Sequence, residues 1–347
     1  MYRNLSNALL GIGFRAEAYR FPPLASLWSH ADTDHFVLIA LHGYAGDGSS
    51  APFFPLYPAF IRMLNLVTHD AYLSAFLVSN VASIVAFIYL YRLINYELGP
   101  HIAERSLLYF AIYPLAFYLC AAYSESLFLA FTVPAFFYAR RRRWWVAGGL
   151  GFFAAMTRLV GFALFFAFLY EYLSQKGVLS GLKLRLQNRR RISWDALSLL
   201  LIPCGLIVVM LINWLAFQNP LQFLAAERFW DRSLTWPWIT VGNDIAKLST
   251  ILVVNYISCV MVLAVIVYGL NKIKPSYLIY AGLSILVPLI SGTMESSMRF
   301  FFVVFPIFMV LGIAGYKHRN IDTAILVTFP VLLGYFAYIY ISGQWIA

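Results

Sequence analysis

The sequence predicts an all-α polytopic integral membrane protein. Three observations support this prediction: 62% of the 347 residues are hydrophobic, only 12% are charged, and the mean hydropathy is +0.75. A soluble domain of that composition would have too little polar surface to cover its exterior. The chain shows no internal repeat and no linker, so residues 1–347 are predicted to form a single transmembrane domain.

Apolar runs of the length that crosses a bilayer recur along the chain. A hydrocarbon core of about 30 Å requires about 20 apolar residues per helix. Runs near that length occupy residues 71–94, 105–121, 124–139, 195–217, 245–270, 276–291, 300–316 and 323–341. One further run, 144–173, is about half as long again as one crossing requires. The transmembrane helices are therefore predicted within residues 71–341.

The basic residues fall in short loops between these runs. The four basic loops are 140–143, 176–191, the pair Lys272 and Lys274, and the pair Lys317 and Arg319. The positive-inside rule places such loops in the cytoplasm, which accounts for the net charge of +10 without a nucleic-acid partner. All four loops can lie on the same side only if the chain crosses the membrane an even number of times between one loop and the next. The run 144–173 must therefore cross the membrane twice. This parity predicts a turn near Thr157 and Arg158.

The remaining loops are then predicted to face the non-cytoplasmic side, and they hold the polar residues that could carry chemistry. They are residues 28–70, 121–125, 157–161, 218–244 and 292–299. The predicted location is a multi-pass cell membrane, which is the inner membrane of a bacterium or the endoplasmic reticulum of a eukaryote. Residues 1–27 hold no apolar run long enough to span. They are expected either to lie on the membrane interface or to follow a helix that precedes this sequence.

The first outer loop, residues 28–70, concentrates acidic, histidine and aromatic residues. Asp32 or Asp34 can serve as the N-cap of a short helix at 35–42, because aspartate is a preferred N-cap residue. Alternatively, either one can act as a general base toward a hydroxyl group. His35 and Asp47 lie in the same loop, where they are candidates for contact with a sugar or an acceptor.

Two arginines stand at the ends of apolar segments, where an ionisable group is costly unless it has a partner. Arg299 can pair with Glu295 four residues earlier on a helix, and Arg158 or Arg299 can extend to the lipid headgroups. The functional alternative is that their guanidinium groups hold a phosphate. No metal is then needed to neutralise it.

Two other outer loops supply further candidates. Tyr123 precedes Ser124 and Glu125, where the serine can cap a helix and the glutamate can complement the helix dipole. Trp230 lies in a long aromatic loop that is either an interfacial belt or a wall that closes over a sugar. The histidines and cysteines have no metal-ligand spacing, so neither a metal nor another cofactor is expected.

In order along the chain, these segments resemble the PIG-V type mannosyltransferases, the family that adds the second mannose in glycosylphosphatidylinositol synthesis, and their bacterial relatives. The first-loop pattern of that family is met by Asp32, His35, Phe36, Ile39, Ala40, Gly43, Tyr44, Asp47, Phe53, Phe54, Pro55 and Pro58. Later matches are residues 123–128, Thr157 and Arg158 with Gly161, residues 219–221 with Phe223 and Trp230, and Arg299 and Phe300 before Phe305 and Pro306.

The resemblance implies a GT-C glycosyltransferase fold and an inverting transfer of mannose from a polyprenyl-phosphate (dolichyl-type) donor to a lipid-linked or glycan acceptor. It also implies that Asp32 is the catalytic aspartate. Arg158 or Arg299 would then stabilise the departing phosphate. Asp34 and Glu125 are reserve candidates for the base or for contacts with sugar hydroxyls. Membrane lipids are the remaining expected partners.

Two other kinds of protein share this composition. A transporter or lipid flippase would also be polytopic, but many transporters have related halves and broken helices near mid-membrane. Here no repeat is visible, and the polar groups gather at one predicted face. A noncatalytic subunit of a glycosyltransferase assembly is the other alternative, because a fold alone does not define an activity.

Overall fold

The computed structural model describes residues 28–344 except His30, Ala45, Asp47, the segment 179–192 and Leu248. Within these residues the regular structure is entirely helical, which confirms the predicted all-α class. The predicted assignments that concern residues 1–27, Asp47 and most of the basic loop 176–191 lie outside the described residues.

The helices follow the apolar runs closely. The first half of the chain contains α3 (Asp32–His42), α4 (Leu56–Thr68), α5 (Ala71–Leu98), α6 (Pro100–Ala111), η1 (Ala116–Leu119), α7 (Glu125–Arg140), α8 (Trp144–Thr157), η2 (Leu159–Phe162) and α9 (Ala163–Gln175). The second half contains η3 (Trp194–Leu200), α11 (Leu201–Phe217), α12 (Gln222–Ala225), η4 (Ala226–Trp230), α13 (Pro237–Ala246), α14 (Thr250–Gly269), α15 (Pro275–Leu289), α16 (Ser297–Phe302), α17 (Pro306–Lys317) and α18 (Arg319–Ile341).

Four of the described helical segments are long and apolar enough to cross a membrane: Ala71–Leu98, Trp194–Phe217, Thr250–Gly269 and Arg319–Ile341. Many of their apolar side chains face outward, and only 11% of the most apolar stretch of α18 is buried. Such a surface suits a lipid environment, in which exposed apolar side chains carry no hydrophobic penalty. The chain is therefore a membrane protein, as predicted.

The long run at 144–173 is two helices, as the charge parity predicted. Helix α8 ends at Thr157, Arg158 is extended, and α9 begins after the short η2. Gly161 makes the turn possible, because a Cβ atom there would lie 2.5 Å from the main chain of Ala154. The chain thus folds back against the end of α8, with Arg158 at the turn.

Two predicted runs are interrupted, each beside a proline. The run at 105–121 stops being helical after Ala111, three residues before Pro114, and the run at 300–316 breaks before Pro306. Proline disfavours helical backbone in the residue before it and removes a hydrogen-bond donor. The first break leads the chain to Tyr118 and Tyr123, and the second isolates the short α16 that carries Arg299.

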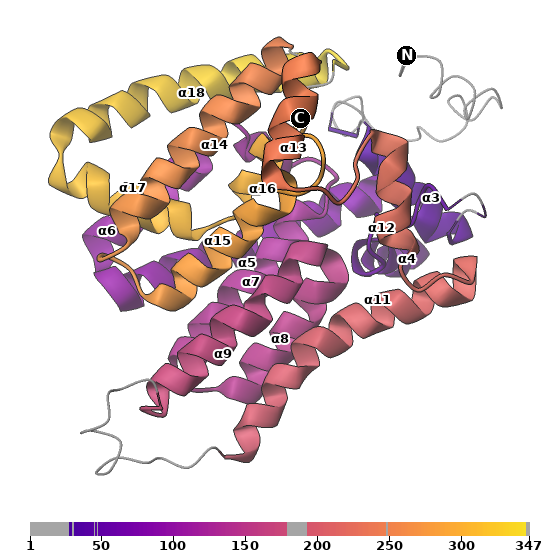
Figure 1. Cartoon of the computed structure of the whole chain (residues 1–347), viewed down its shortest axis with the longest axis horizontal. Coiled ribbons are helices and arrows are strands. Elements are labelled where there is room, and N and C mark those ends of the chain that lie inside the picture. The colour runs from indigo at the N-terminus through magenta and orange to yellow at the C-terminus, as the bar shows by residue number, and fades with distance from the viewer. Residues whose placement is uncertain are drawn as a thin grey trace.

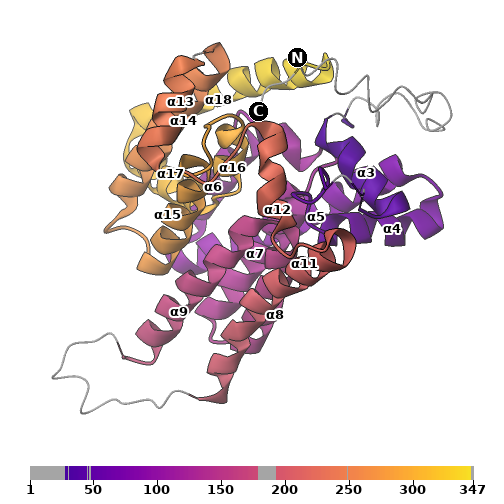
Figure 2. The same cartoon turned by 45° about the vertical axis from the view of Figure 1, so that its right-hand side comes forward.

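Helices α13–α18 lie together on one side of the molecule and α8, α9 and α11 on the other (Figures 1 and 2). Helix α7 packs against α5 and α8, and the two sides meet where α15 packs against α9. Helix α7 belongs to the largest apolar core, where Phe136 contacts the rings of Phe168, Tyr277 and Phe305. Its 16 residues span about 24 Å. The two ends of this central helix therefore lie in different surroundings, and its first residue is Glu125.

Candidate active site

A cavity of about 310 Å³ lies at the N-terminal end of α7. All five loops that the charge pattern assigned to one side contribute to its wall. Its lining includes Asp32, Phe53, Tyr123, Glu125, Arg158, Glu227, Trp230, Arg232, Arg299 and Phe300. We refer to it as the polar cavity. The predicted grouping of these loops is thus matched by their convergence in space.

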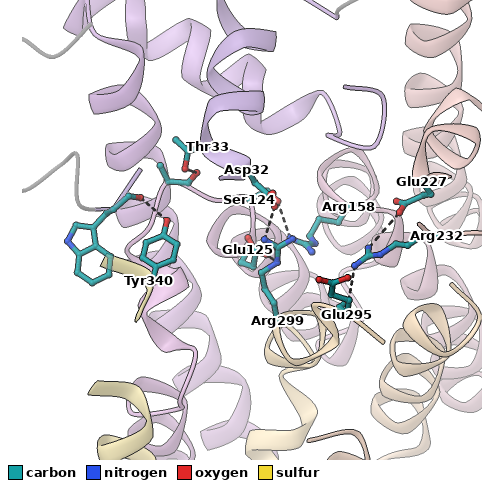
Figure 3. Close-up of polar contacts among 12 residues, drawn as sticks. Asp32, Thr33, Ser124, Glu125, Arg158, Glu227, Arg232, Glu295, Arg299 and Tyr340 are labelled. Carbon is teal, nitrogen blue, oxygen red and sulfur yellow. Dashed lines mark hydrogen bonds and ion pairs between the residues drawn. The ribbon is translucent and has the colours of Figure 1, made fainter. Parts of the chain in front are cut away.

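Asp32 and Arg299, which are 267 residues apart, form an ion pair in this cavity (Figure 3). The Arg299 Nη1 donates to Asp32 Oδ2 at 2.7 Å, and Arg299 Nε lies 3.3 Å from Glu125 Oε1. The predicted alternative that Arg299 pairs with Glu295 is therefore wrong. The main-chain oxygen of Glu295 instead accepts a hydrogen bond from Arg232 at 2.8 Å.

Glu125 is fully buried and pairs with the second predicted arginine. Arg158 Nη1 lies 2.7 Å from Glu125 Oε1 and donates to Ser124 Oγ at 3.1 Å. Neither Glu125 carboxylate oxygen has hydrogen-bond geometry with any described partner. A buried carboxylate is costly without a counter-charge, and here Arg158 and Arg299 supply it. Glu125 thereby holds both guanidinium groups at the cavity wall.

The helix-cap interpretation of Ser124 is correct in position only. Ser124 is the N-cap residue of α7, but its side chain makes no capping hydrogen bond. Its hydroxyl accepts from Arg158 instead. Glu125 occupies the first turn, where a negative charge is favoured by the helix dipole. The local sequence signal for a helix start therefore coincides with a charge cluster that only the packing reveals.

The capping interpretation of Asp32 and Asp34 is wrong. Helix α3 begins at Asp32, its N-cap is Ala31, and no side chain caps it. Both acids occupy the first turn, which a helix dipole also favours. Residues two apart on a helix face different directions, and the structure separates them accordingly. Asp32 lines the polar cavity, whereas Asp34 accepts a hydrogen bond from Tyr72 Oη at 2.9 Å and is not part of the lining.

The aromatic candidates form part of the cavity wall and its support. Trp230 lines the cavity, and His35 reaches it only indirectly, because its ring stacks on Phe53 at 4.5 Å and meets Trp230 edge-on at 6.1 Å. Tyr123 is buried beside Arg299, with 5.3 Å between the ring centre and the guanidinium carbon. Burial raises the pKa of Tyr123 well above its ordinary value. Its hydroxyl therefore stays protonated at neutral pH.

Arg232 and Glu227 are cavity residues that the sequence did not distinguish from the rest of the aromatic loop. Arg232 Nη1 lies 3.6 Å from Glu227 Oε2, and the two side chains are 14% and 34% exposed. Burial lowers the pKa of Arg232 and raises the pKa of Glu227. Both shifts mean that the charged forms are less well compensated here than in water. The available signal was an acidic and a basic residue five positions apart in a loop that was predicted to face outward.

Three guanidinium groups surround the ring of Phe300. Their carbon atoms lie 5.6, 5.1 and 5.7 Å from the ring centre, for Arg158, Arg232 and Arg299 respectively. Attraction to the face of the ring offsets part of the repulsion between the like charges. Three acids, Asp32, Glu125 and Glu227, complete the charged lining. The cavity therefore offers both cations and carboxylates to a bound molecule.

Within the part of the chain that the structure describes, no three His, Cys, Asp or Glu side chains lie close enough together to hold a metal ion. The cavity instead brings carboxylates and guanidinium groups within reach of one ligand. The fold and site define a class: an all-α membrane protein with a charged, ligand-sized cavity where helix ends and loops meet.

Comparison with known families identifies the group to which this protein belongs. The family model described as mannosyltransferase (PIG-V) matches residues 23–227. This is more than half of the chain, so the chain belongs to the PIG-V mannosyltransferase family, and the predicted resemblance is confirmed. The match includes Asp32, Glu125 and Arg158. Arg232 and Arg299 lie beyond it.

One curated relative extends the comparison. Human GPI alpha-1,6-mannosyltransferase 2 is 33% identical over 144 residues, which are 38% of this chain and 29% of the human protein. The chain therefore aligns with less than a third of that relative's length. No solved structure matches the chain.

Proposed function

We propose that this protein is a multi-pass membrane mannosyltransferase with a GT-C type fold. It transfers mannose, with inversion, from a polyprenyl-phosphate-mannose donor to a hydroxyl group of a lipid-linked or glycan acceptor on the non-cytoplasmic face. Membership of the PIG-V family supports the reaction class. The observation that carries the proposal is the meeting of Asp32 with three arginines in one cavity.

Asp32 acts as the general base in this mechanism. Arg299 binds its Oδ2, so Oδ1 is available to take the proton from the acceptor hydroxyl. The acceptor oxygen attacks the anomeric carbon, the bond from that carbon to the phosphate oxygen breaks, and the polyprenyl phosphate leaves with the bonding electrons. A phosphate is stable as an anion, so the leaving group requires no general acid. Arg299 orients the base through the same ion pair.

The phosphate is held by arginine side chains in this proposal. Arg158 and Arg299 each lie within 3.3 Å of a carboxylate oxygen. The charge of Arg232 is less fully compensated than the charges of these two arginines. Its shortest contact is with the neutral main-chain oxygen of Glu295, and its Nη1 lies 3.6 Å from Glu227 Oε2. This difference supports Arg232 as a third phosphate ligand beside the two that the sequence predicted. A planar guanidinium group can donate two parallel hydrogen bonds to two oxygens of one phosphate.

The other predicted residues take different parts. Glu125 is fully buried between two arginines, which favours a role in positioning them over a role as the base. Asp34 is engaged with Tyr72 outside the lining, so it is the weaker candidate for the base. Tyr123 and Trp230 are proposed to form the sugar-facing wall, and His35 supports Trp230.

The test is transfer from radiolabelled polyprenyl-phosphate-mannose in native membranes. We expect Asp32→Asn to lower turnover by about 10²–10⁴-fold, the usual contribution of a general base. Asp34→Asn is the matched control, because it makes the same change two residues later on α3, outside the cavity lining. It should retain most of the activity. Unchanged turnover in Asp32→Asn would overturn the proposal.

A purified sample separates the rival functions. Turnover of the donor by the chain alone would argue against a noncatalytic subunit. Movement of a labelled lipid from one leaflet of a vesicle membrane to the other, without transfer of mannose, would instead identify a flippase.

A further inference from the structure

A second hollow, of about 430 Å³, lies at the opposite end of α7 from the polar cavity. It is formed where the C-terminal ends of α5 and α7 meet the turn that leads into α8. Its lining consists of Arg92, Asn95, Tyr96, Phe137, Tyr138, Arg141 and Arg143. It contains three arginines and no acidic residue. We call this hollow the basic groove.

The turn between α7 and α8 selects which arginines reach the groove. The Arg143 N–H donates to the main-chain oxygen of Tyr138 at 2.9 Å, and the Arg141 N–H donates to the same oxygen at 3.1 Å. Arg142 between them has a positive φ of 60°, the left-handed conformation that closes a tight turn. As a result Arg141 and Arg143 line the groove, whereas Arg142 does not.

The groove arginines have no acid partner among the described residues. The nearby acids Glu97 and Glu171 are both paired with Arg140 at the end of α7. None of the ion pairs in the described part of the chain includes Arg92, Arg141 or Arg143. No acidic residue in the described part of the chain therefore compensates the positive charge of the groove.

Aromatic rings orient these charges without neutralising them. The guanidinium carbon of Arg141 lies 4.3 Å from the ring centre of Phe137 and 5.4 Å from that of Tyr96. Arg92 lies 5.6 Å from the ring centre of Tyr89. Stacking fixes the plane of a guanidinium group while leaving its N–H donors available. An oxyanion placed in the groove would meet these donors already oriented.

We propose that the basic groove binds the phosphate headgroup of an anionic phospholipid. Phosphate is the anion whose paired oxygens fit the fork of an arginine. A lipid is favoured as its source because the groove lies at the end of apolar helices. Trp145, two residues after Arg143 in the chain, is exposed, and tryptophan is enriched at membrane interfaces. Basic pockets at such positions bind anionic headgroups. The site is separate from the proposed catalytic cavity.

The positive-inside effect alone would also account for basic residues in this loop, but it requires only charge. The groove makes a sharper prediction, because Arg141 and Arg142 carry the same charge and only one of them lines the hollow. Arg142→Gln is therefore a matched control for Arg141→Gln and Arg143→Gln.

The experiment uses the full chain in detergent micelles supplemented with phosphatidylglycerol or with phosphatidylcholine. Retained lipid is measured by native mass spectrometry, and stability by thermal unfolding. We expect phosphatidylglycerol to bind and to raise the unfolding temperature, and phosphatidylcholine to do neither. Arg141→Gln and Arg143→Gln should each weaken phosphatidylglycerol binding by about tenfold. Arg142→Gln should change it by less than about twofold.

Two results would overturn the proposal. An equal loss in Arg142→Gln and Arg141→Gln would mean that diffuse charge, not the groove, attracts the lipid. Equal stabilisation by inorganic phosphate or glycerol phosphate at matched concentration, with no additional effect of phosphatidylglycerol, would make the site one for a soluble anion.

Discussion

The two ends of α7 hold buried charge clusters that are built differently. At one end, Arg140 pairs with Glu97 and Glu171. The carboxylate of Glu171 also accepts hydrogen bonds from Gln175 and Ser276, both at 2.7 Å. At the other end, Glu125 lies between Arg158 and Arg299, but its oxygens make no hydrogen bond with a described residue.

The difference separates a structural cluster from a candidate site. Around Glu171 the carboxylate is satisfied on both oxygens, and neither it nor Arg140 lines either of the two hollows. Around Glu125 the charges adjoin a cavity of about 310 Å³. In a medium of low dielectric, charges that are not fully paired interact strongly with an added ligand. We therefore expect the first cluster to stabilise the fold and the second to bind substrate.

The largest expected effect comes from removing the central acid of each cluster. Glu125→Gln and Glu171→Gln should each destabilise the fold by about 3–5 kcal/mol, because each leaves a buried arginine undercompensated. Only Glu125→Gln should also reduce mannose transfer per folded molecule, by about 100-fold, through misplacement of Arg158 and Arg299. Thermal unfolding and transfer assays on the same preparations measure the two effects. Equal loss of transfer in both variants would break the comparison.

A smaller effect is expected at Arg232. Arg232→Gln removes a charged hydrogen-bond donor from the cavity, a change of about 1.5–3 kcal/mol, and should raise KM for the donor by at least about tenfold. Arg228→Gln is the control, because Arg228 is exposed in the same loop and does not line the cavity. Steady-state kinetics with varied donor would measure the difference. Similar KM values in the two variants would remove Arg232 from the phosphate site.

Phe300 tests whether the ring organises the arginines around it. Phe300→Leu keeps an apolar side chain but removes the aromatic face, which is worth about 0.5–2 kcal/mol to a nearby cation. We expect kcat/KM to fall by about three- to tenfold, with little change in stability. Phe229→Leu is the control, because the ring of Phe229 also lies beside an arginine but outside the cavity lining. This variant should leave kcat/KM unchanged.

The smallest effect concerns pH and Glu227. Burial raises the pKa of this carboxyl group, so the folded protein binds its proton more tightly than the unfolded chain does. The protonated form therefore adds to the free energy of unfolding at low pH. This contribution falls as the pH rises from the ordinary glutamate pKa, near 4.5, through the raised pKa of the folded protein. Glu227→Gln should flatten this slope. Unfolding temperatures of both proteins between about pH 4 and pH 7 measure it; parallel curves would contradict the assignment.

Much of the helical framework was predictable from short stretches of sequence. The length of each apolar run set where α5, α7, α15 and α18 begin and end to within a few residues. Charge parity placed a turn at Arg158, which the structure confirms. These features depend on whether a local segment prefers lipid or water, so composition and spacing decide them. The runs did not indicate α4, α13 or the breaks beside Pro114 and Pro306.

The relation between the candidate site residues was decided by the tertiary structure. The sequence offered Asp34 as a reserve for Asp32 and Glu295 as one possible partner of Arg299, but packing turned only Asp32 toward the cavity and paired it with Arg299. Such contacts join loops hundreds of residues apart. They depend on how the helices pack, because helix packing sets which loop ends meet and which charges must compensate each other where water is excluded.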